Sequence, residues 1–136
     1  MLVVNNYFYV YNGNMEQEDY LEEIYNLFKE NGHIRISDIA NSLNVKKPSV
    51  TQMMQRLKKE DCLLYEPYSP IKLTEKGYKI GKSVAERHRV LAEFFTILGI
   101  SKQIQEKDIH GIEHSLSETT LKRLKEVSAF LKKKKF

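Results

Sequence analysis

The sequence contains one cysteine, Cys62, among its 136 residues. A single thiol can neither form an internal disulfide nor complete a four-cysteine zinc site, which excludes disulfide-stapled scaffolds and zinc ribbons. No apolar run is long enough for a membrane span, and 29% of the residues are charged, with a mean hydropathy of −0.50. We therefore expect a protein of a reducing, cytoplasmic compartment that has no membrane partner.

The length of the chain is too small for a large multidomain enzyme and suits one compact domain, or a small domain with a helical module. Residues 1–14 have no basic start and no small-residue cleavage pattern, so they do not match a secretory signal. We expect them to be an extension, either disordered or a short strand, with Met15 as an alternative natural start. No function is assigned to this extension.

The net charge of +4 is unevenly distributed along the chain. Residues 1–45 carry two basic and seven acidic residues, whereas residues 46–82 carry nine basic and four acidic ones. Residues 83–131 hold seven of each sign, and Lys132 to Lys135 add four positive charges, expected to be solvated. The basic middle segment favours contact with a polyanion, and an ordinary solvated surface is the alternative.

Apolar residues at three- and four-residue spacing predict helices over residues 16–31, 38–43 and 48–59. Ser37 is expected to cap the second of these, and Pro48 suits the first turn of the third. Residues 62–65 and 71–74 flank a proline-rich turn, which predicts a two-stranded hairpin. Further helices are predicted over residues 74–98 and 102–114, and from Ser115 or Ser117 onward.

This order of helices and hairpin is that of a winged helix-turn-helix, whose third helix enters the DNA major groove. The residues of the third helix predicted to face the core are Val50, Met53, Met54 and Leu57. The residues predicted to contact DNA, through base edges or phosphates, are Lys46, Lys47, Pro48, Ser49, Thr51, Gln52, Gln55, Arg56, Lys59 and, in the wing, Lys72. Double-stranded DNA is therefore the expected partner.

Metal-binding side chains gather in the carboxyl-terminal half of the sequence. His110, Glu113 and His114 follow the spacing i, i+3, i+4, which places all three on one side of a helix. Asp19 and Glu22 lie three residues apart on the first helix, where a bound cation would relieve their repulsion. Taken singly, each of these fragments, and His88 with them, is more typical of a surface or packing residue.

Several stretches together resemble one known family over nearly 116 of the 136 residues. They are Glu18–Tyr25, Ser37–Ala40, Pro48–Met53, Leu73–Gly77, Arg87–Arg89 and Gly111–His114. In these segments the chain resembles the metal-dependent transcriptional regulators of the diphtheria toxin repressor type, and most closely their short, manganese-responsive branch, the manganese transport regulators. The iron-responsive branch usually adds a small barrel domain, for which this sequence leaves no room.

The resemblance implies a mainly α fold, with a winged helix-turn-helix over residues 15–77 and a helical dimerisation and metal-binding domain over residues 78–136. It implies metal ligands at Asp19, Glu22, His88, Glu113 and His114. The sixth position, usually glutamate in the manganese branch, is His110, and an imidazole there shifts preference toward iron(II), cobalt(II) or zinc. Manganese stays first, with one or two ions per subunit left open.

The resemblance further implies a homodimeric repressor that binds operator DNA when loaded with metal and controls metal-uptake genes. The row predicted to face inward from the last helix, or to supply a dimer interface, is Leu121, Leu124, Val127 and Leu131. One alternative is a winged-helix regulator without metal sensing. Another is a small metallohydrolase with Glu113 as base, disfavoured because no zinc-hydrolase pattern or pocket for an organic substrate is recognisable.

Overall fold

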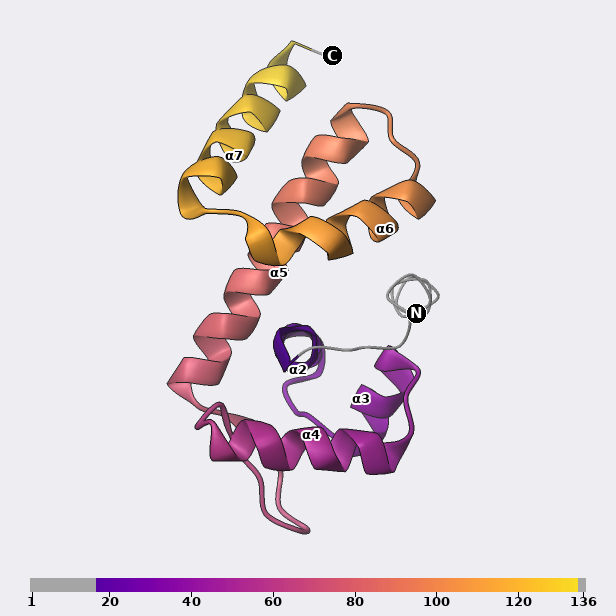
Figure 1. Cartoon of the computed structure of the whole chain (residues 1–136), viewed down its shortest axis with the longest axis vertical. Coiled ribbons are helices and arrows are strands. Elements are labelled where there is room, and N and C mark those ends of the chain that lie inside the picture. The colour runs from indigo at the N-terminus through magenta and orange to yellow at the C-terminus, as the bar shows by residue number, and fades with distance from the viewer. Residues whose placement is uncertain (1–16, 135–136) are drawn as a thin grey trace. The chain divides into compact units, whose positions relative to one another are not determined.

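A computed structural model describes residues 17–134, so the expectations for residues 1–14 lie outside the described part of the chain. The chain divides into two compact units, which we call the amino-terminal unit, residues 1–85, and the carboxyl-terminal unit, residues 86–136. The first contains the helices α2 (Gln17–Asn31), α3 (Ile36–Leu43) and α4 (Lys47–Lys59) and the strands β1 (Leu63–Leu64) and β2 (Lys72–Leu73). The helix α5 (Glu75–Ile97) crosses the division, and α6 (Lys102–Ile112), the 3-10 turn η1 (Glu113–Ser115) and α7 (Glu118–Lys133) follow it (Figure 1). The mainly α fold is confirmed.

The core of the amino-terminal unit is built by α2, α3 and α4, which pack on one another. α2 ends where Gly32 adopts a left-handed φ of 75° and its N–H donates to the Phe28 carbonyl. α3 begins at Ile36 because Arg35 is extended, so Ser37 lies inside the first turn and its predicted capping role is wrong. Asn44 then ends α3 in the left-handed conformation that asparagine tolerates.

The helix α4 presents a clear division between a buried and an exposed face. Val50, Met53, Met54 and Leu57 are buried in the core, which confirms the inward row predicted from their spacing. Pro48 lies in the first turn, where its missing N–H leaves no intrahelical bond unmade. The other side of α4 is left free to present polar side chains.

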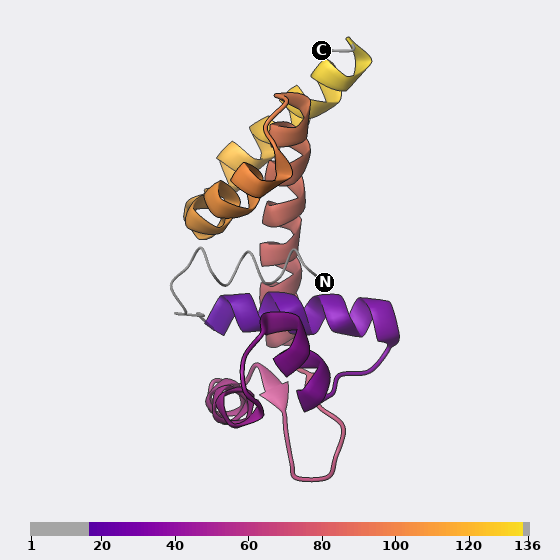
Figure 2. The ribbon, with the colours of Figure 1, turned by 90° about the vertical axis from the view of Figure 1, so that its right-hand side faces the viewer.

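The two strands form an antiparallel pair in which Leu63 faces Leu73 and Leu64 faces Lys72. The ladder is shorter than the strands predicted over residues 62–65 and 71–74, because only two residues of each segment pair. The connecting loop projects away from α2, α3 and α4 in both views (Figures 1 and 2). Such a hairpin after the third helix is the wing of a winged helix-turn-helix.

The start of α5 is fastened to the end of α4 by a small hydrogen-bonded cluster. The Thr74 hydroxyl donates to the Asp61 carbonyl over 2.6 Å and accepts the Gly77 N–H at 3.1 Å. Gly77 is required here, because a Cβ at this position would lie 1.9 Å from the Cys62 carbonyl oxygen. The start of α5 is therefore anchored to the turn that follows α4.

The carboxyl-terminal unit contains the later part of α5 with α6, η1 and α7. Its buried apolar residues are Val90, Leu91, Ile109 and Leu121. α6 and α7 begin at serine caps, because Ser101 accepts the Ile104 N–H and Ser117 accepts the Thr120 N–H.

Two ion pairs join α7 to α5, Lys125 to Glu86 at 2.6 Å and Lys132 to Glu93 at 2.7 Å. On both helices the second partner lies seven residues after the first, so α5 and α7 run in the same direction.

The predicted inward row of α7 is only partly buried, since Val127 stays 44% exposed. Among the described residues, no helix combines the length and apolar character that a bilayer crossing requires.

Candidate metal centre and nucleic-acid interface

The end of α6 brings three of the predicted metal ligands into one short stretch. The α-helix ends at Ile112, two residues earlier than predicted, and the chain tightens into η1 over Glu113–Ser115. The cause lies in Ile112, whose φ of −118° departs from helical geometry, although the Glu113 N–H still donates to the Ile109 carbonyl. His110 therefore belongs to the last turn of α6, whereas Glu113 and His114 belong to η1.

Glu113 is fully buried and lies between two imidazoles of the same unit. Its Oε2 is 3.1 Å from Nδ1 of His88, which comes from α5, and its Oε1 is 3.7 Å from Nε2 of His114. Burial of a carboxylate is costly unless hydrogen bonds or a cation offset the lost hydration. Each oxygen of Glu113 is thus directed at a different nitrogen donor.

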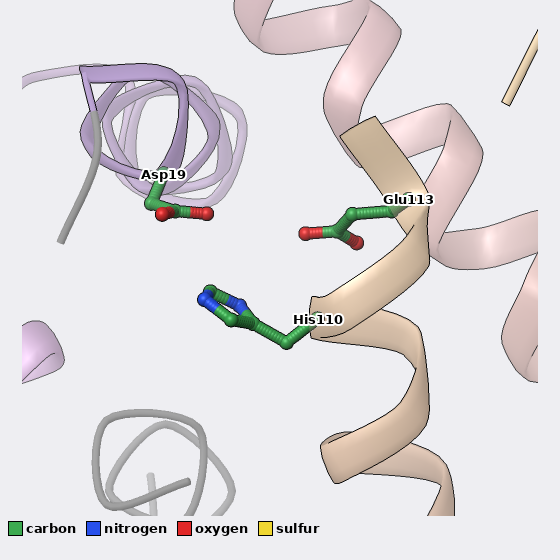
Figure 3. Close-up of side chains that lie close together, drawn as sticks. All are labelled: Asp19, His110 and Glu113. Carbon is green, nitrogen blue, oxygen red and sulfur yellow. The ribbon is translucent and has the colours of Figure 1, made fainter. Parts of the chain in front are cut away.

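His110 is also fully buried, and its ring meets that of His114 edge to face at a centroid distance of 6.3 Å. One ring nitrogen of His110 lies within 4.8 Å of a Glu113 carboxylate oxygen. Figure 3 shows both side chains projecting from the same side of the ribbon at the junction of α6 and η1. The carboxyl-terminal unit therefore brings three histidines, His88, His110 and His114, together around the carboxylate of Glu113.

Asp19 and Glu22, the two predicted ligands of the amino-terminal unit, lie in the first turns of α2. Both are buried, whereas Glu18 beside them is exposed. Figure 3 draws Asp19 with its carboxylate projecting from α2. Carboxylates rarely occupy buried positions unless they are paired or bind metal, so these two are distinguished from ordinary surface charge.

The donor chemistry fits a divalent transition metal. Carboxylate oxygens suit Mn²⁺ and imidazole nitrogens suit Fe²⁺, Co²⁺ and Zn²⁺, so a mixed set admits all four. Every ligand predicted from the sequence is buried or half-buried, which keeps the donors away from bulk water. These residues could hold such an ion, and their protein neighbours would have to keep the donors oriented.

Sequence reasoning missed one acidic residue of this region, Glu106 on α6. Its side chain is only 5% exposed, and burial raises the pKa of its carboxyl while His88 and Lys102 act to lower it. Its spacing of four residues from His110 places it on the same helix face. This spacing alone does not predict its burial, because the surrounding residues Lys102 to Asp108 are mostly charged and polar, which is typical of a solvated face.

Arg87 positions the chain that follows the ligands of η1. Its guanidinium donates through Nη1 to the Leu116 carbonyl, and Nη2 lies 2.9 Å from a Glu118 carboxylate oxygen. Because Arg87 precedes His88 on α5, it fixes the exit of η1 against the helix that carries that histidine. Leu116 is two residues from His114, so this contact orients the ligand-bearing turn.

The residues predicted to contact DNA all lie in the amino-terminal unit. Nine of them are exposed and one, Thr51, is half-buried: Lys46, Lys47, Pro48, Ser49, Thr51, Gln52, Gln55, Arg56, Lys59 and Lys72. Lys58, by contrast, is joined to Glu66 of the wing loop by an ion pair of 2.7 Å. A polar surface on α4 and beside the wing, with cations at five of these ten positions, is suited to base edges and phosphates.

Comparison with known families matches the two halves of the chain separately. Residues 14–71 match the family model of the iron dependent repressor, N-terminal DNA binding domain. Residues 74–135 match that of the iron dependent repressor, metal binding and dimerisation domain.

Similar proteins give the same result. The HTH-type transcriptional regulator MntR of Bacillus subtilis (strain 168) is 46% identical over 107 residues, which cover 79% of this chain and 75% of the relative. Among solved structures, the manganese regulator SloR is similar at a TM-score of 0.70 with 28% identity, over 84% of this chain and 54% of that one. ScaR with bound Zn²⁺ is similar at a TM-score of 0.64 with 28% identity, over 83% of this chain and 53% of that one.

The chain thus spans about half the length of these two solved proteins. Its relatives are transcriptional regulators, which supports the prediction that it is no enzyme and removes the metallohydrolase alternative. The resemblance drawn from the sequence is confirmed: the chain belongs to the iron-dependent repressor family of metal-dependent transcriptional regulators.

Proposed function

We propose that this protein, loaded with a divalent metal, binds operator DNA as a homodimer in the cytoplasm and represses metal-uptake genes. The observation that carries the proposal is Glu113, a fully buried carboxylate with one oxygen directed at His88 and the other at His114. A group of this kind suits a metal centre better than a hydrophobic core, because its charge needs a counterion.

The proposed ligands are Asp19, Glu22, His88, His110, Glu113 and His114. Four of them, His88, His110, Glu113 and His114, belong to the carboxyl-terminal unit, and Asp19 and Glu22 belong to the amino-terminal unit. Glu113 has two carboxylate oxygens directed at different histidines, so it could serve two ions if two are bound. Whether one or two ions occupy the centre is a matter for stoichiometry measurements.

Manganese is the first candidate metal, with Fe²⁺, Co²⁺ and Zn²⁺ next. Three carboxylates favour a hard ion, whereas three imidazoles, among them the fully buried His110, favour a borderline one. The names of similar proteins point the same way, since SloR is a manganese regulator and ScaR is described with bound Zn²⁺.

The coupling of metal to DNA follows from where the ligands lie in the sequence. Asp19 and Glu22 belong to the unit that carries α4 and the wing, whereas the other four belong to the unit matched by a dimerisation domain. Holding both sets of side chains at one centre would restrict the reading heads of a dimer to operator spacing. Without a cation, the acidic side chains repel and this restriction is lost.

DNA contacts are proposed for the exposed side of α4. Gln52, Gln55 and Arg56 have the reach and the donor patterns for base edges, whereas Lys46, Lys47, Lys59 and the wing residue Lys72 would contact phosphates. Ser49, Thr51 and Pro48 complete the surface near the start of the helix.

The experiment that tests the proposal measures DNA binding by the purified, chelator-treated protein. Random double-stranded 30-mers are selected with the protein in the presence of Mn²⁺, and the enriched sequence is titrated with Mn²⁺, Fe²⁺, Co²⁺, Zn²⁺ and EDTA at one fixed salt concentration. We expect an enriched palindrome and tighter binding with at least one metal. Replacement of Glu113 by Gln should remove the metal response.

Asp108→Asn is a matched control, because it removes one negative charge from an exposed position of α6 and should leave the response intact. Equal DNA affinity in EDTA and in every metal would overturn the metal-sensing proposal and favour a winged-helix regulator without metal sensing.

A further inference from the structure

A cavity of about 370 Å³ lies within the amino-terminal unit, at the base of the wing. We call it the wing-base pocket and define it by the residues that line it: Phe28, residues 32–34, residues 70–73 and Tyr78. They come from the last turn of α2, the loop after it, the segment that contains β2, and the first turn of α5. None of the proposed metal ligands lines this pocket, so the metal centre does not explain it.

The wing-base pocket has an apolar and partly aromatic wall. Ile34 and Ile71 are buried and belong to the core, so one side of the pocket is firmly packed. Phe28 is 41% exposed, which opens the other side to solvent, and the half-buried Tyr78 ring meets the Tyr25 ring edge to face at a centroid distance of 5.3 Å. Pockets of about 300–1,000 Å³ with apolar and aromatic walls are the usual binding places for small organic molecules.

The ionisable side chains beside this wall are basic. His33 and Lys72 line the pocket and are exposed, and no carboxylate of the described chain lines it. Neither of the two forms an ion pair with any of residues 17–134. The Lys82 ammonium lies 6.0 Å from the centroid of the Tyr78 ring and adds a cation beside the aromatic wall. The pocket therefore favours a ligand that carries a negative charge.

We propose that the wing-base pocket binds an aromatic carboxylate. The ring system packs against Phe28 and Tyr78, because aromatic rings gain from such contacts beyond the area that they bury. The carboxylate is held by Lys72 and, when its imidazole is protonated, by His33. A wholly apolar ligand would leave these cations unused, and an inorganic anion would leave the apolar wall in contact with water. The site lies within one unit and needs no metal, so it is independent of the proposed function.

The test is isothermal titration of the full chain with 2-naphthoate, a two-ring aromatic carboxylate. The matched ligand is 2-naphthylmethanol, which has the same ring system and no charge. EDTA is present throughout, because it prevents a metal ion from binding the carboxylate in place of the pocket. We expect one saturable site per chain, with an affinity for the acid about fivefold above that for the alcohol, the upper range for an exposed ion pair.

Two substitutions separate the apolar contact from the ionic one. Phe28→Ser should weaken the binding of both ligands by about tenfold, because an aromatic wall is lost. Its control is Tyr68→Ser, which removes a fully exposed ring of the same unit outside the pocket and should change neither affinity. Lys72→Gln should weaken only the binding of 2-naphthoate, by about fivefold. Its control is Lys29→Gln, at an exposed position of α2 outside the pocket.

Three outcomes overturn the inference. The first is the absence of saturable 2-naphthoate binding by the wild-type protein. The second is equal affinity for the acid and the alcohol, which would remove the role of the cations. The third is wild-type affinity in a folded Phe28→Ser protein, which would place the ligand elsewhere. If Phe28→Ser does not fold, Lys72→Gln decides the question, because Lys72 is exposed and its loss leaves the core intact.

Discussion

At the scale of single residues, the addition of one methyl group at Gly77 should strongly destabilise the fold. Replacement by alanine would place Cβ 1.9 Å from the Cys62 carbonyl oxygen, a backbone atom that cannot move without displacing the hairpin. We expect the free energy of unfolding to fall by about 2 kcal/mol or more, in the upper range for overpacking. Urea denaturation followed by circular dichroism measures this change.

Gly111→Ala is the matched control for this substitution. No atom lies within 4 Å of a Cβ built on Gly111, and the residue is inside α6. Alanine is a better helix former than glycine by about 1 kcal/mol, so the metal-free variant should be as stable as the wild type or more so. Equal losses in both variants would show that the contact between Gly77 and Cys62 is not the cause.

The thiol of Cys62 should react slowly with thiol reagents in the folded protein. The thiol is 3% exposed, and burial raises its pKa above the ordinary value of 9.0, so less thiolate is present at a given pH. Because the unfolded thiol ionises first, this group stabilises the fold below pH 9 and loses that contribution as the pH rises through the folded pKa.

Two measurements check this expectation. Ellman's reagent at pH 8 should react slowly with native protein and rapidly in urea. The stability difference between wild type and Cys62→Ala should narrow above pH 9. Rapid native labelling, at the rate found in urea, would contradict the burial of this thiol.

At the scale of elements, Arg87 is the link between α5 and the turn that carries two proposed ligands. Arg87→Ala removes the donors to the Leu116 carbonyl and the Glu118 carboxylate. We expect a loss of about 1–2 kcal/mol in stability from the unsatisfied carbonyl, and a Mn²⁺ affinity lowered by about tenfold.

The control is Glu118→Gln, which weakens the ion pair between Arg87 and the exposed Glu118 and keeps the hydrogen bond from Arg87 to the Leu116 carbonyl. Isothermal titration with Mn²⁺ and urea denaturation distinguish the two. A metal affinity unchanged in Arg87→Ala would mean that η1 keeps its geometry without this anchor.

Most helices could be predicted from the sequence, because their apolar residues follow helical spacing closely. The buried row of α4 could be predicted without tertiary information, because its members follow the spacing i, i+3, i+4, i+7 that places them on one helix face: Val50, Met53, Met54 and Leu57. The hairpin was predicted from its prolines, and Ser117, the cap of α7, was one of the two predicted start positions of that helix. These features depend on residues that are close together in the sequence, so the sequence alone predicts them.

Features that depend on the surroundings could not be predicted. The cap at Ser37 failed because the extended Arg35 fixes an earlier start, and the change from α6 to η1 depends on the backbone of Ile112. Glu106 has the sequence context of a surface residue and is buried only by the packing of the whole unit. The ligand candidates themselves came from a resemblance of motifs and not from spacing alone.

At the scale of the whole molecule, the exposed apolar residues of α7 bear on assembly. Val127 and Phe130 are 44% and 59% exposed on the unit matched by a dimerisation domain. We expect Phe130→Glu to raise the dimer dissociation constant by at least about tenfold, because large aromatic side chains dominate the energy of interfaces. Sedimentation equilibrium measures this constant directly.

Lys122→Glu changes the charge of another exposed position on α7 and is the matched control. An unchanged dimer in Phe130→Glu would place the interface elsewhere on the chain. The DNA affinity of a monomeric variant should fall with its dimerisation, since a palindromic operator is bound by two heads.

The tip of the wing loop gives the protein a natural cleavage site. Tyr68 is fully exposed there with a left-handed φ of 64°, between Pro67 and Pro70. Chymotrypsin cuts after exposed aromatic residues in loops, so the bond from Tyr68 to Ser69 should be nicked first. If the wing lies along DNA, the digestion rate at this one bond becomes a label-free gauge of operator occupancy, slowed by the metal that promotes binding and restored by a chelator.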